Sequence, residues 1–421
     1  MKRALIAVLA LLLALGLCGC ASMLDHNYTV VQPHEDGPTS DGDVITAETY
    51  QQLEDAVIYF IDQGMSYGVV HLSNYDPDRG DVEADVDAAC LYAVQEYPLG
   101  AYAVSYIKPQ TSYIVSYYEV SVYISYRRTQ DQVKSIVSVT GTSAIREELQ
   151  DTLRSFGAEA VLRVTYFNED EEFIRELVRQ AYYDTPESAL GMPEVTVSLY
   201  PGLPEGEETA PGGVRIVEIQ LSYPEDPELL QKKKEKLVSQ LSSAAAHLEV
   251  KADQAGTRTL FDLLRSTAQY SLRDEDGRRA NTAYAALVEG RADSEGMALA
   301  YQLLCQYTGI ECTVVSGTLD GADWYWNIVT LSDGESRHVD ATRADGFALQ
   351  DAEMAEQGYQ WDREEFPSCG LQPAAEETIL PSDIPVPLIP VPTDVPPVTA
   401  EASPSGGSGA LMSVVSGERE K

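Results

Sequence analysis

Residues 281–345 read NTAYAALVEGRADSEGMALAYQLLCQYTGIECTVVSGTLDGADWYWNIVTLSDGESRHVDATRAD. A short helix is predicted over 282–289, and a second helix starts near Ser294, carries apolar side chains at helical spacing and ends at Gly309. Three short strands follow, at 311–317, 323–331 and 336–340. This order predicts a helix packed on an antiparallel sheet, which is an α+β architecture.

Several residues along this stretch occur in the order and spacing of a known family. They are Glu295-Gly296-Met297-Ala298, Gly309-Ile310, Gly317, Trp326-Asn327 and His338-Val339-Asp340-Ala341-Thr342. Together they resemble the transglutaminase-like (papain-like) superfamily, closely over 281–345 and loosely over 257–370. The resemblance implies a C-terminal domain, at 253–370, of helices on an antiparallel sheet.

The resemblance also implies three functional positions, which this family fills with Cys, His and Asp. Here those positions hold Ser294, Trp324 and Asp340. A thiolate at a helix N-terminus is the nucleophile of such a site, an imidazole is its base, and a carboxylate fixes the tautomer of the imidazole. The first two groups are missing, so we expect a degenerate, non-catalytic domain, a pseudoenzyme, that serves binding or scaffolding.

An enzymatic alternative uses the Ser294 hydroxyl with a displaced base. A helix dipole contributes only about 0.3–1 kcal/mol, which cannot ionise a hydroxyl, and the Trp324 indole offers a donor but no acceptor. His338 lies two residues before Asp340, so both side chains are expected on one face of their strand, and His338 is the candidate substitute base. This alternative is a hydrolase or acyltransferase. The simpler interpretation makes Ser294 an N-cap and Trp324 a filler of the cleft.

The charge of the chain limits its partners. Asp and Glu number 67 against 29 Lys and Arg, which gives a formal net charge of −38. Nucleic-acid phosphates need basic side chains, so a nucleic-acid partner is excluded. The acidity suits a solvated protein at a cell surface. We predict no cofactor.

The first nineteen residues are predicted to be a lipoprotein signal peptide. Lys2 and Arg3 precede an apolar run over 4–15 that is short for a membrane span. Leu17-Cys18-Gly19-Cys20 fits a bacterial lipoprotein box, with cleavage before Cys20 and acylation there. The chain would then be lipid-anchored on the extracytoplasmic face of the cell membrane, with 20–45 as a tether. An ordinary secretory signal is the alternative.

The mature chain would keep four cysteines, for which three pairings exist. They are Cys90, Cys305, Cys312 and Cys369. Cys305 and Cys312 come close enough in sequence to pair across the end of a helix, although free buried thiols fit equally well. No pair has the spacing of a zinc site, so no metal is predicted.

Between tether and C-terminal domain, the sequence repeats itself weakly. The first module, 46–139, is predicted as helices at 47–63 and 82–96 with strands at 68–73, 101–107 and 117–126. The second, 140–252, has helices at 144–156 and 171–182, strands at 160–166, 194–200 and 214–223, and a linking helix at 227–252. We expect two tandem α/β modules, with chance similarity as the alternative. Tyrosines crowd the 101–126 hairpin, which suits a binding face or ordinary strand propensity.

The last segment, 371–421, is rich in Pro, Gly and Ser and is predicted to be a disordered tail. A wall-spanning spacer or a docking peptide are alternatives. The predicted partners are therefore the membrane, through lipid on Cys20, and a peptide, an exported protein or a cell-wall polymer. A purely structural spacer is a third functional hypothesis.

Overall fold

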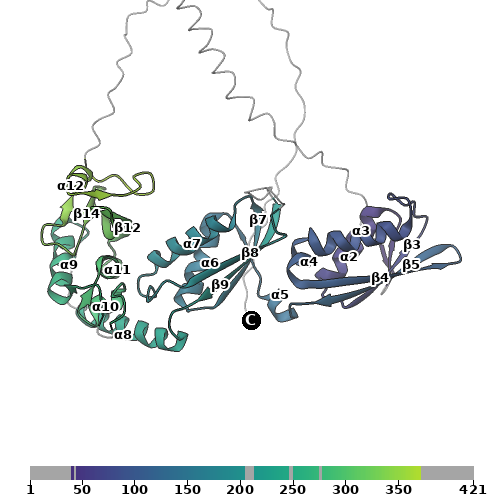
Figure 1. Ribbon diagram of the computed structural model, residues 1–421, viewed down its shortest axis with the longest axis horizontal. Helices are drawn as coiled ribbons and strands as arrows, with labels where there is room; N and C mark the ends of the chain where they lie inside the picture. Colours follow the sequence, from purple (N-terminus) through teal and green to yellow (C-terminus); the bar gives the residue numbers. More distant parts are fainter. Residues whose placement is uncertain (1–38, 42–43, 204–212, 246–249, 275–276, 371–421) are drawn as a thin grey trace, which may run out of the picture. The chain divides into compact units, whose positions relative to one another are not determined.

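The computed structural model describes residues 39–41, 44–203, 213–245, 250–274 and 277–370 (Figure 1). The predicted signal peptide, Cys20, most of the predicted tether and the 371–421 tail lie outside the described residues. By its internal contacts the chain divides into 1–370 and 371–421, and every element below belongs to the first part. In the described ranges, no helix combines the length and the apolar character that crossing a membrane requires.

The first module is a five-stranded sheet with helices on one face (Figure 1). Its elements are β1 (Thr39–Asp41), β2 (Val44–Ala47), α2 (Tyr50–Asp62), β3 (Tyr67–Leu72), α3 (Val82–Gln95), α4 (Pro98–Ala103), β4 (Val104–Ile114) and β5 (Tyr117–Tyr126). The strand order is β1-β2-β3-β5-β4, and only the β2–β3 pair is parallel. Apolar side chains of α2 and α3 close a core of their own against the sheet.

The second module repeats this topology. Its elements are α5 (Gln130–Lys134), β6 (Val137–Thr140), α6 (Thr142–Arg154), β7 (Glu159–Phe167), α7 (Glu171–Asp184), β8 (Glu194–Tyr200) and β9 (Gly213–Ser222). The order β6-β7-β9-β8, with β6 and β7 parallel, matches β2-β3-β5-β4 strand for strand. The weak sequence repeat therefore corresponds to a repeat of structure.

Three local predictions in these modules were wrong. Each module contains a short strand, β2 or β6, that runs parallel to the next strand and that we did not expect, because four residues are too few to show an alternating pattern. As a result the end of the expected tether, residues 39–41 and 44–45, belongs to the sheet. The strand expected at 101–107 begins as α4, which Pro98 starts at its first position.

The C-terminal part places helices on an antiparallel sheet, as predicted. Its elements are α8 (Pro227–Ala245), α9 (Gln254–Thr267), β10 (Gln269–Tyr270), α10 (Ala283–Leu287), β11 (Arg291–Ala292), α11 (Ser294–Tyr307), β12 (Glu311–Leu319), β13 (Ala322–Thr330), β14 (Ser336–Val339), β15 (Phe347–Leu349), α12 (Asp351–Glu356) and β16 (Tyr359–Gln360). The sheet order is β15-β14-β13-β12-β16, and β10 pairs separately with β11. The α+β fold class is confirmed.

One continuous apolar core joins the second module to the C-terminal domain. Side chains of α6, α7, α8, α9 and α11 all belong to it, together with those of both sheets. The first module instead meets β7 and β9 through a small cluster around Tyr102 and Ala103, and through the Arg128–Glu218 ion pair at 2.6 Å. The apolar core therefore extends across the predicted domain boundary at 252/253.

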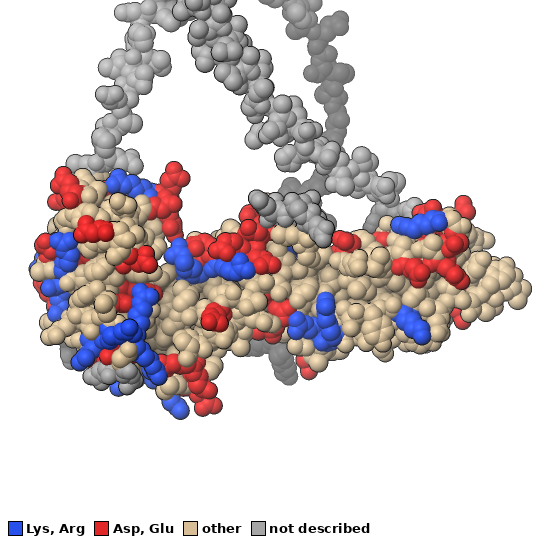
Figure 2. Space-filling model, in the orientation of Figure 1, with Lys and Arg blue, Asp and Glu red and all other residues tan. Residues whose placement is uncertain are grey.

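The cysteines of the described residues form no disulfide. Cys90, Cys305, Cys312 and Cys369 are all free and buried, so the candidate Cys305–Cys312 disulfide is not formed. On the face shown in Figure 2, acidic side chains are scattered and basic ones lie between them. The negative charge therefore does not gather into one patch on that face.

Candidate functional site

The site begins at the N-terminus of α11, where Ser294 is the first helical residue. Asp293 is the N-cap, and its Oδ1 accepts the backbone N–H of Gly296 at 3.0 Å. The N-cap role expected for Ser294 was therefore wrong, because the carboxylate one residue earlier takes it. The Ser294 side chain is buried, and no hydrogen-bond partner for its hydroxyl lies among the described residues.

Gly296 lets the start of α11 pack closely against the preceding loop. A Cβ at this position would lie 2.7 Å from the Ala280 carbonyl oxygen and 2.8 Å from the Thr282 nitrogen, distances that real side chains do not tolerate. This glycine of the motif therefore has a packing role that any larger residue would disrupt.

Trp324 and Asp340 are brought into direct contact. The indole Nε1–H of Trp324, on β13, donates to Asp340 Oδ2 at 2.9 Å. An imidazole at residue 324 would present one N–H to this carboxylate and keep a second nitrogen free as a base. The indole has a single nitrogen, and Asp340 occupies it. Trp324 thus donates a hydrogen bond to Asp340 and has no nitrogen that could accept a proton.

Asp340 is fully buried and accepts four hydrogen bonds. Besides the indole, Tyr359 donates its hydroxyl to Oδ2 at 2.6 Å, while Thr342 donates its backbone N–H (2.9 Å) and its hydroxyl (2.6 Å) to Oδ1. Burial and the neighbouring Asp340 raise the pKa of Tyr359, so this phenol stays protonated and remains a donor. Tyr359 was not predicted from the sequence, whereas Thr342 belongs to the motif.

An aromatic side chain borders Trp324. The ring of Tyr270, on β10, lies against the indole with centroids 5.6 Å apart, and Tyr270 is 45% exposed. This tyrosine was not among the predicted site residues, because a two-residue strand leaves no pattern in the sequence. Trp324 and Tyr270 together form an aromatic pair beside Asp340.

His338 lies on β14, Asp340 follows directly after the end of that strand, and both ring nitrogens of His338 are engaged. Nδ1 accepts the indole N–H of Trp326 at 3.0 Å, and Nε2 lies 2.8 Å from Asp351 Oδ1. The side chain is fully buried. Serving Ser294 as a base would require His338 to give up one of these two bonds.

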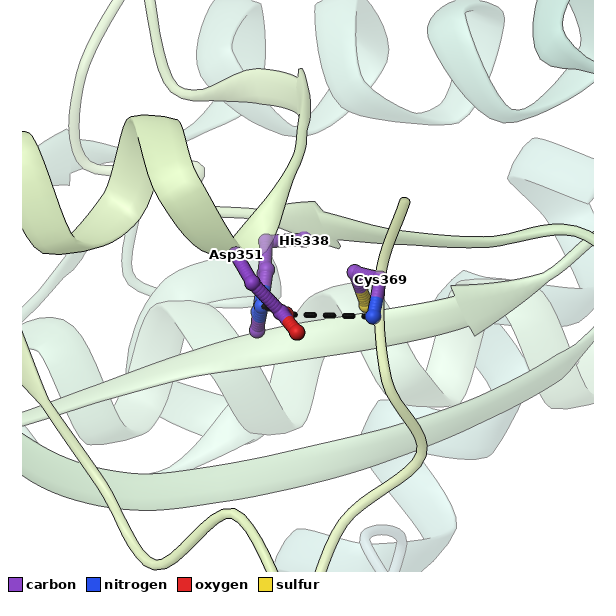
Figure 3. A group of neighbouring side chains, drawn as sticks. All are labelled: His338, Asp351 and Cys369. Carbon is purple, nitrogen blue, oxygen red and sulfur yellow. Dashed lines mark hydrogen bonds and ion pairs between the residues drawn. The ribbon is translucent and has the colours of Figure 1, made fainter. Parts of the chain in front are cut away.

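His338, Asp351 and Cys369 form a compact cluster (Figure 3), with candidate ligand atoms within 4.8 Å of one another. The Trp326 N–H fixes Nδ1 as an acceptor, so the single proton of the neutral ring sits on Nε2 and is donated to Asp351. A metal ion would need that same Nε2 lone pair. Asp351 Oδ1 also accepts the Cys369 backbone N–H at 3.1 Å, and burial raises the pKa of the Cys369 thiol to about 12. The donor set fits a hydrogen-bonded cluster better than a metal centre.

The cluster predicts an acid-sensitive fold. Burial lowers the pKa of His338, against an opposing effect of Asp351. Below about pH 6.5 the unfolded chain therefore takes up a proton that the folded chain excludes, and the free energy of unfolding falls until the lowered pKa is passed. We expect His338→Gln to lose less stability between pH 7.5 and pH 5.5 than the wild type, measured by urea unfolding.

The matched control for this pH series is His71→Gln, a partly exposed histidine of the first module bonded to Glu119. It should leave the pH dependence of the C-terminal transition unchanged. If His338→Gln and the wild type had parallel pH profiles, exclusion of a proton from His338 would be ruled out as a source of acid sensitivity.

The C-terminal part of the chain matches a known family model. The model of the Transglutaminase-like superfamily matches residues 243–361. Among solved structures, the chain is similar to a TGase, with 10% identity over 53% of this chain and 61% of that chain, at a TM-score of 0.23. The chain thus spans less than two thirds of the TGase.

Two further structures show comparable likeness. One is a proposed cysteine protease from Cytophaga hutchinsonii, with 11% identity over 37% of this chain and 68% of that one, at a TM-score of 0.22. The other is a proposed protease from Parabacteroides distasonis, with 10% identity over 53% and 45%, at a TM-score of 0.20. The comparison with curated proteins found no match.

Proposed function

We propose that the transglutaminase-like domain formed by residues 243–361 is non-catalytic and serves as a binding domain. The bond from Trp324 Nε1 to Asp340 Oδ2, at 2.9 Å, carries this proposal. It satisfies the buried carboxylate with a group that cannot take up a proton. The arrangement keeps the geometry around Asp340 while removing general-base catalysis from residue 324.

The hydrogen bonding around Ser294 supports the same conclusion. A serine hydroxyl needs a base at hydrogen-bond distance before it can attack a carbonyl, and none is bonded to Ser294 among the described residues. The base of the alternative mechanism, His338, is bonded on both nitrogens. Loss of nucleophile or base in a well-studied triad lowers turnover by about a millionfold.

The experiment that tests the proposal is active-site labelling of the full chain. We expect fluorophosphonate and acyl-phosphate probes to leave Ser294 unmodified, as read by intact mass and peptide mapping. The Ser294→Ala variant sets the background level. Stoichiometric modification of the wild type that disappears in Ser294→Ala would show a working nucleophile and establish the hydrolase or acyltransferase instead.

For location, we propose a lipid anchor at Cys20 on the extracytoplasmic face of the cell membrane. The basic, apolar and Leu17-Cys18-Gly19-Cys20 segments support it. The domain would then meet peptides, exported proteins or cell-wall polymers. In a fractionation experiment, Cys20→Ala should move the protein from the membrane to the soluble fraction. Retention of Cys20→Ala on the membrane would refute the anchor.

A further inference from the structure

A groove of ≈ 460 Å³ lies between α7 of the second module and the N-terminal end of α11. We call it the α7 groove. Helix α7 contributes Glu172 and Glu176 to one side, and the C-terminal domain contributes Arg279 and Tyr325. Both sides belong to the same continuous core, so the groove is built on rigid elements. Its volume falls in the range of about 300–1,000 Å³ found for small-ligand sites.

The floor of the α7 groove is a buried carboxylate, Glu295, which is only 3% exposed. Tyr183 donates its hydroxyl to Oε1 at 3.1 Å and Asn281 Nδ2 donates to Oε2 at 3.1 Å, while Arg279 Nη2 forms an ion pair with Oε2 at 3.0 Å. Burial raises the pKa of Glu295, and Arg279 opposes the rise. Four side chains from two parts of the chain are thereby fixed around one point.

Arg279 is the group in this floor that remains available to a ligand. Its Nε donates to Asp293 Oδ2 at 3.0 Å and its Nη2 forms an ion pair with Glu295, and these two contacts orient the planar guanidinium. The side chain is nevertheless 57% exposed, and no acceptor for Nη1 lies among the described residues. A pre-oriented guanidinium edge of this kind suits a carboxylate.

The accessible charges of the groove have both signs. Arg175 and Arg179 on α7 join Arg279 to make three guanidinium groups, against the exposed carboxylates of Glu172 and Glu176. Arg175 is paired with Glu172 at 2.9 Å and Arg179 with Glu176 at 2.6 Å, so Arg279 is the guanidinium with an N–H left for a ligand anion. A ligand ammonium group would share the Glu172 and Glu176 carboxylates with these two arginines.

An apolar wall completes the groove. The rings of Tyr183 and Tyr325 lie with their centroids 6.0 Å apart, and Met192 and Val195 stand beside them. Such a surface accepts an uncharged side chain. A ligand that uses the whole groove therefore has a carboxylate, an ammonium group and an apolar body.

We infer that the α7 groove binds a short peptide, with its free C-terminal carboxylate on Arg279, its ammonium group toward Glu172 and Glu176, and its side chain on Tyr325. This inference rests on the proposed binding function and names the class of ligand. Tyr183 on α7 donates a hydrogen bond to Glu295 of the C-terminal domain, so the second module forms part of the binding site.

The test is calorimetric titration of the full chain with alanyl-leucine, its C-terminal amide and its N-acetyl derivative. Each blocked form lacks one charge and should bind about tenfold more weakly than the free dipeptide. Arg279→Lys keeps the charge, but its single nitrogen cannot contact Asp293, Glu295 and a ligand carboxylate together, so it should weaken the free dipeptide about fivefold or more while leaving the amide unaffected. Glu172→Gln with Glu176→Gln should weaken the free dipeptide and spare the N-acetyl form.

The matched control is Arg258→Gln, which removes another exposed guanidinium that is paired within its own helix. It should bind the dipeptide like the wild type. Equal binding of the acid and the amide, unchanged binding by Arg279→Lys, or no saturation up to about 10 mM would each overturn the inference. None of these results would show catalysis, so the proposed non-catalytic function would still stand. Conversely, release of leucinamide from the amide during the titration would refute the proposed function without bearing on the role of Arg279.

Discussion

Replacing Ser294 by cysteine and Trp324 by histidine together is expected to produce a reactive thiol. An ordinary thiol, with a pKa of about 8.5, is only a few per cent ionised at pH 7. At the first position of α11 the helix N-terminus favours the thiolate, and an imidazole oriented by Asp340 would favour it further. Alkylation by iodoacetamide at pH 7 should therefore be about tenfold faster in the double variant than in Ser294→Cys alone.

The wild-type chain is a suitable background for this measurement. Burial raises the pKa of both Cys90 and Cys369 to about 12 and that of Cys312 well above its ordinary value, so these three thiols should react slowly. Peptide mapping assigns the label. If the double variant reacted no faster than Ser294→Cys, residue 324 would not face residue 294, and the family geometry implied by the sequence would be wrong here.

Replacing Asp340 by alanine is expected to destabilise the C-terminal domain by about 3 kcal/mol or more, measured by urea unfolding. The carboxylate is fully buried, and its removal leaves the donors of Trp324, Tyr359 and Thr342 without an acceptor. Each orphaned donor costs about 1–3 kcal/mol. Through these hydrogen bonds Asp340 would thus act as a structural residue.

The control for this prediction is Asp345→Ala, which removes an exposed carboxylate paired only with Arg343 in the same loop. Exposed pairs of this kind are worth about 0–1 kcal/mol, so little change is expected. Asp340→Asn keeps one acceptor oxygen and should fall between the two variants. A loss from Asp340→Ala no larger than that from Asp345→Ala would show that the four hydrogen bonds do not stabilise the fold.

The sequence predicted which residues meet at this site because the motif residues keep a fixed order along the chain. The order of Gly296, Trp326 and Asp340 was enough to align Ser294 and Trp324 with the family's positions, and the indole–carboxylate contact follows from that alignment. Helices such as α11, with a long apolar face, were predicted within a residue or two.

The parts that escaped prediction depend on contacts between distant segments. Tyr359 reaches Asp340 only because β16 pairs with β12 at the sheet edge, and β16 has two residues. The partner of His338, Asp351, comes from a helix that the sequence did not indicate. The N-cap of α11 could not be predicted to the exact residue, because adjacent Asp and Ser are both good N-caps and only the backbone conformation decides between them.

The continuous core of the second module and the C-terminal domain has a consequence for cooperativity. Leu177 of α7 and Leu299 of α11 share one apolar interior, so neither half can melt without exposing the other to water. The first module, with an interior of its own, is free to melt independently. Heating should therefore show two separate heat-capacity peaks, the larger from residues 137–370, and a chain shortened to the domain alone would lose the partner that keeps it folded.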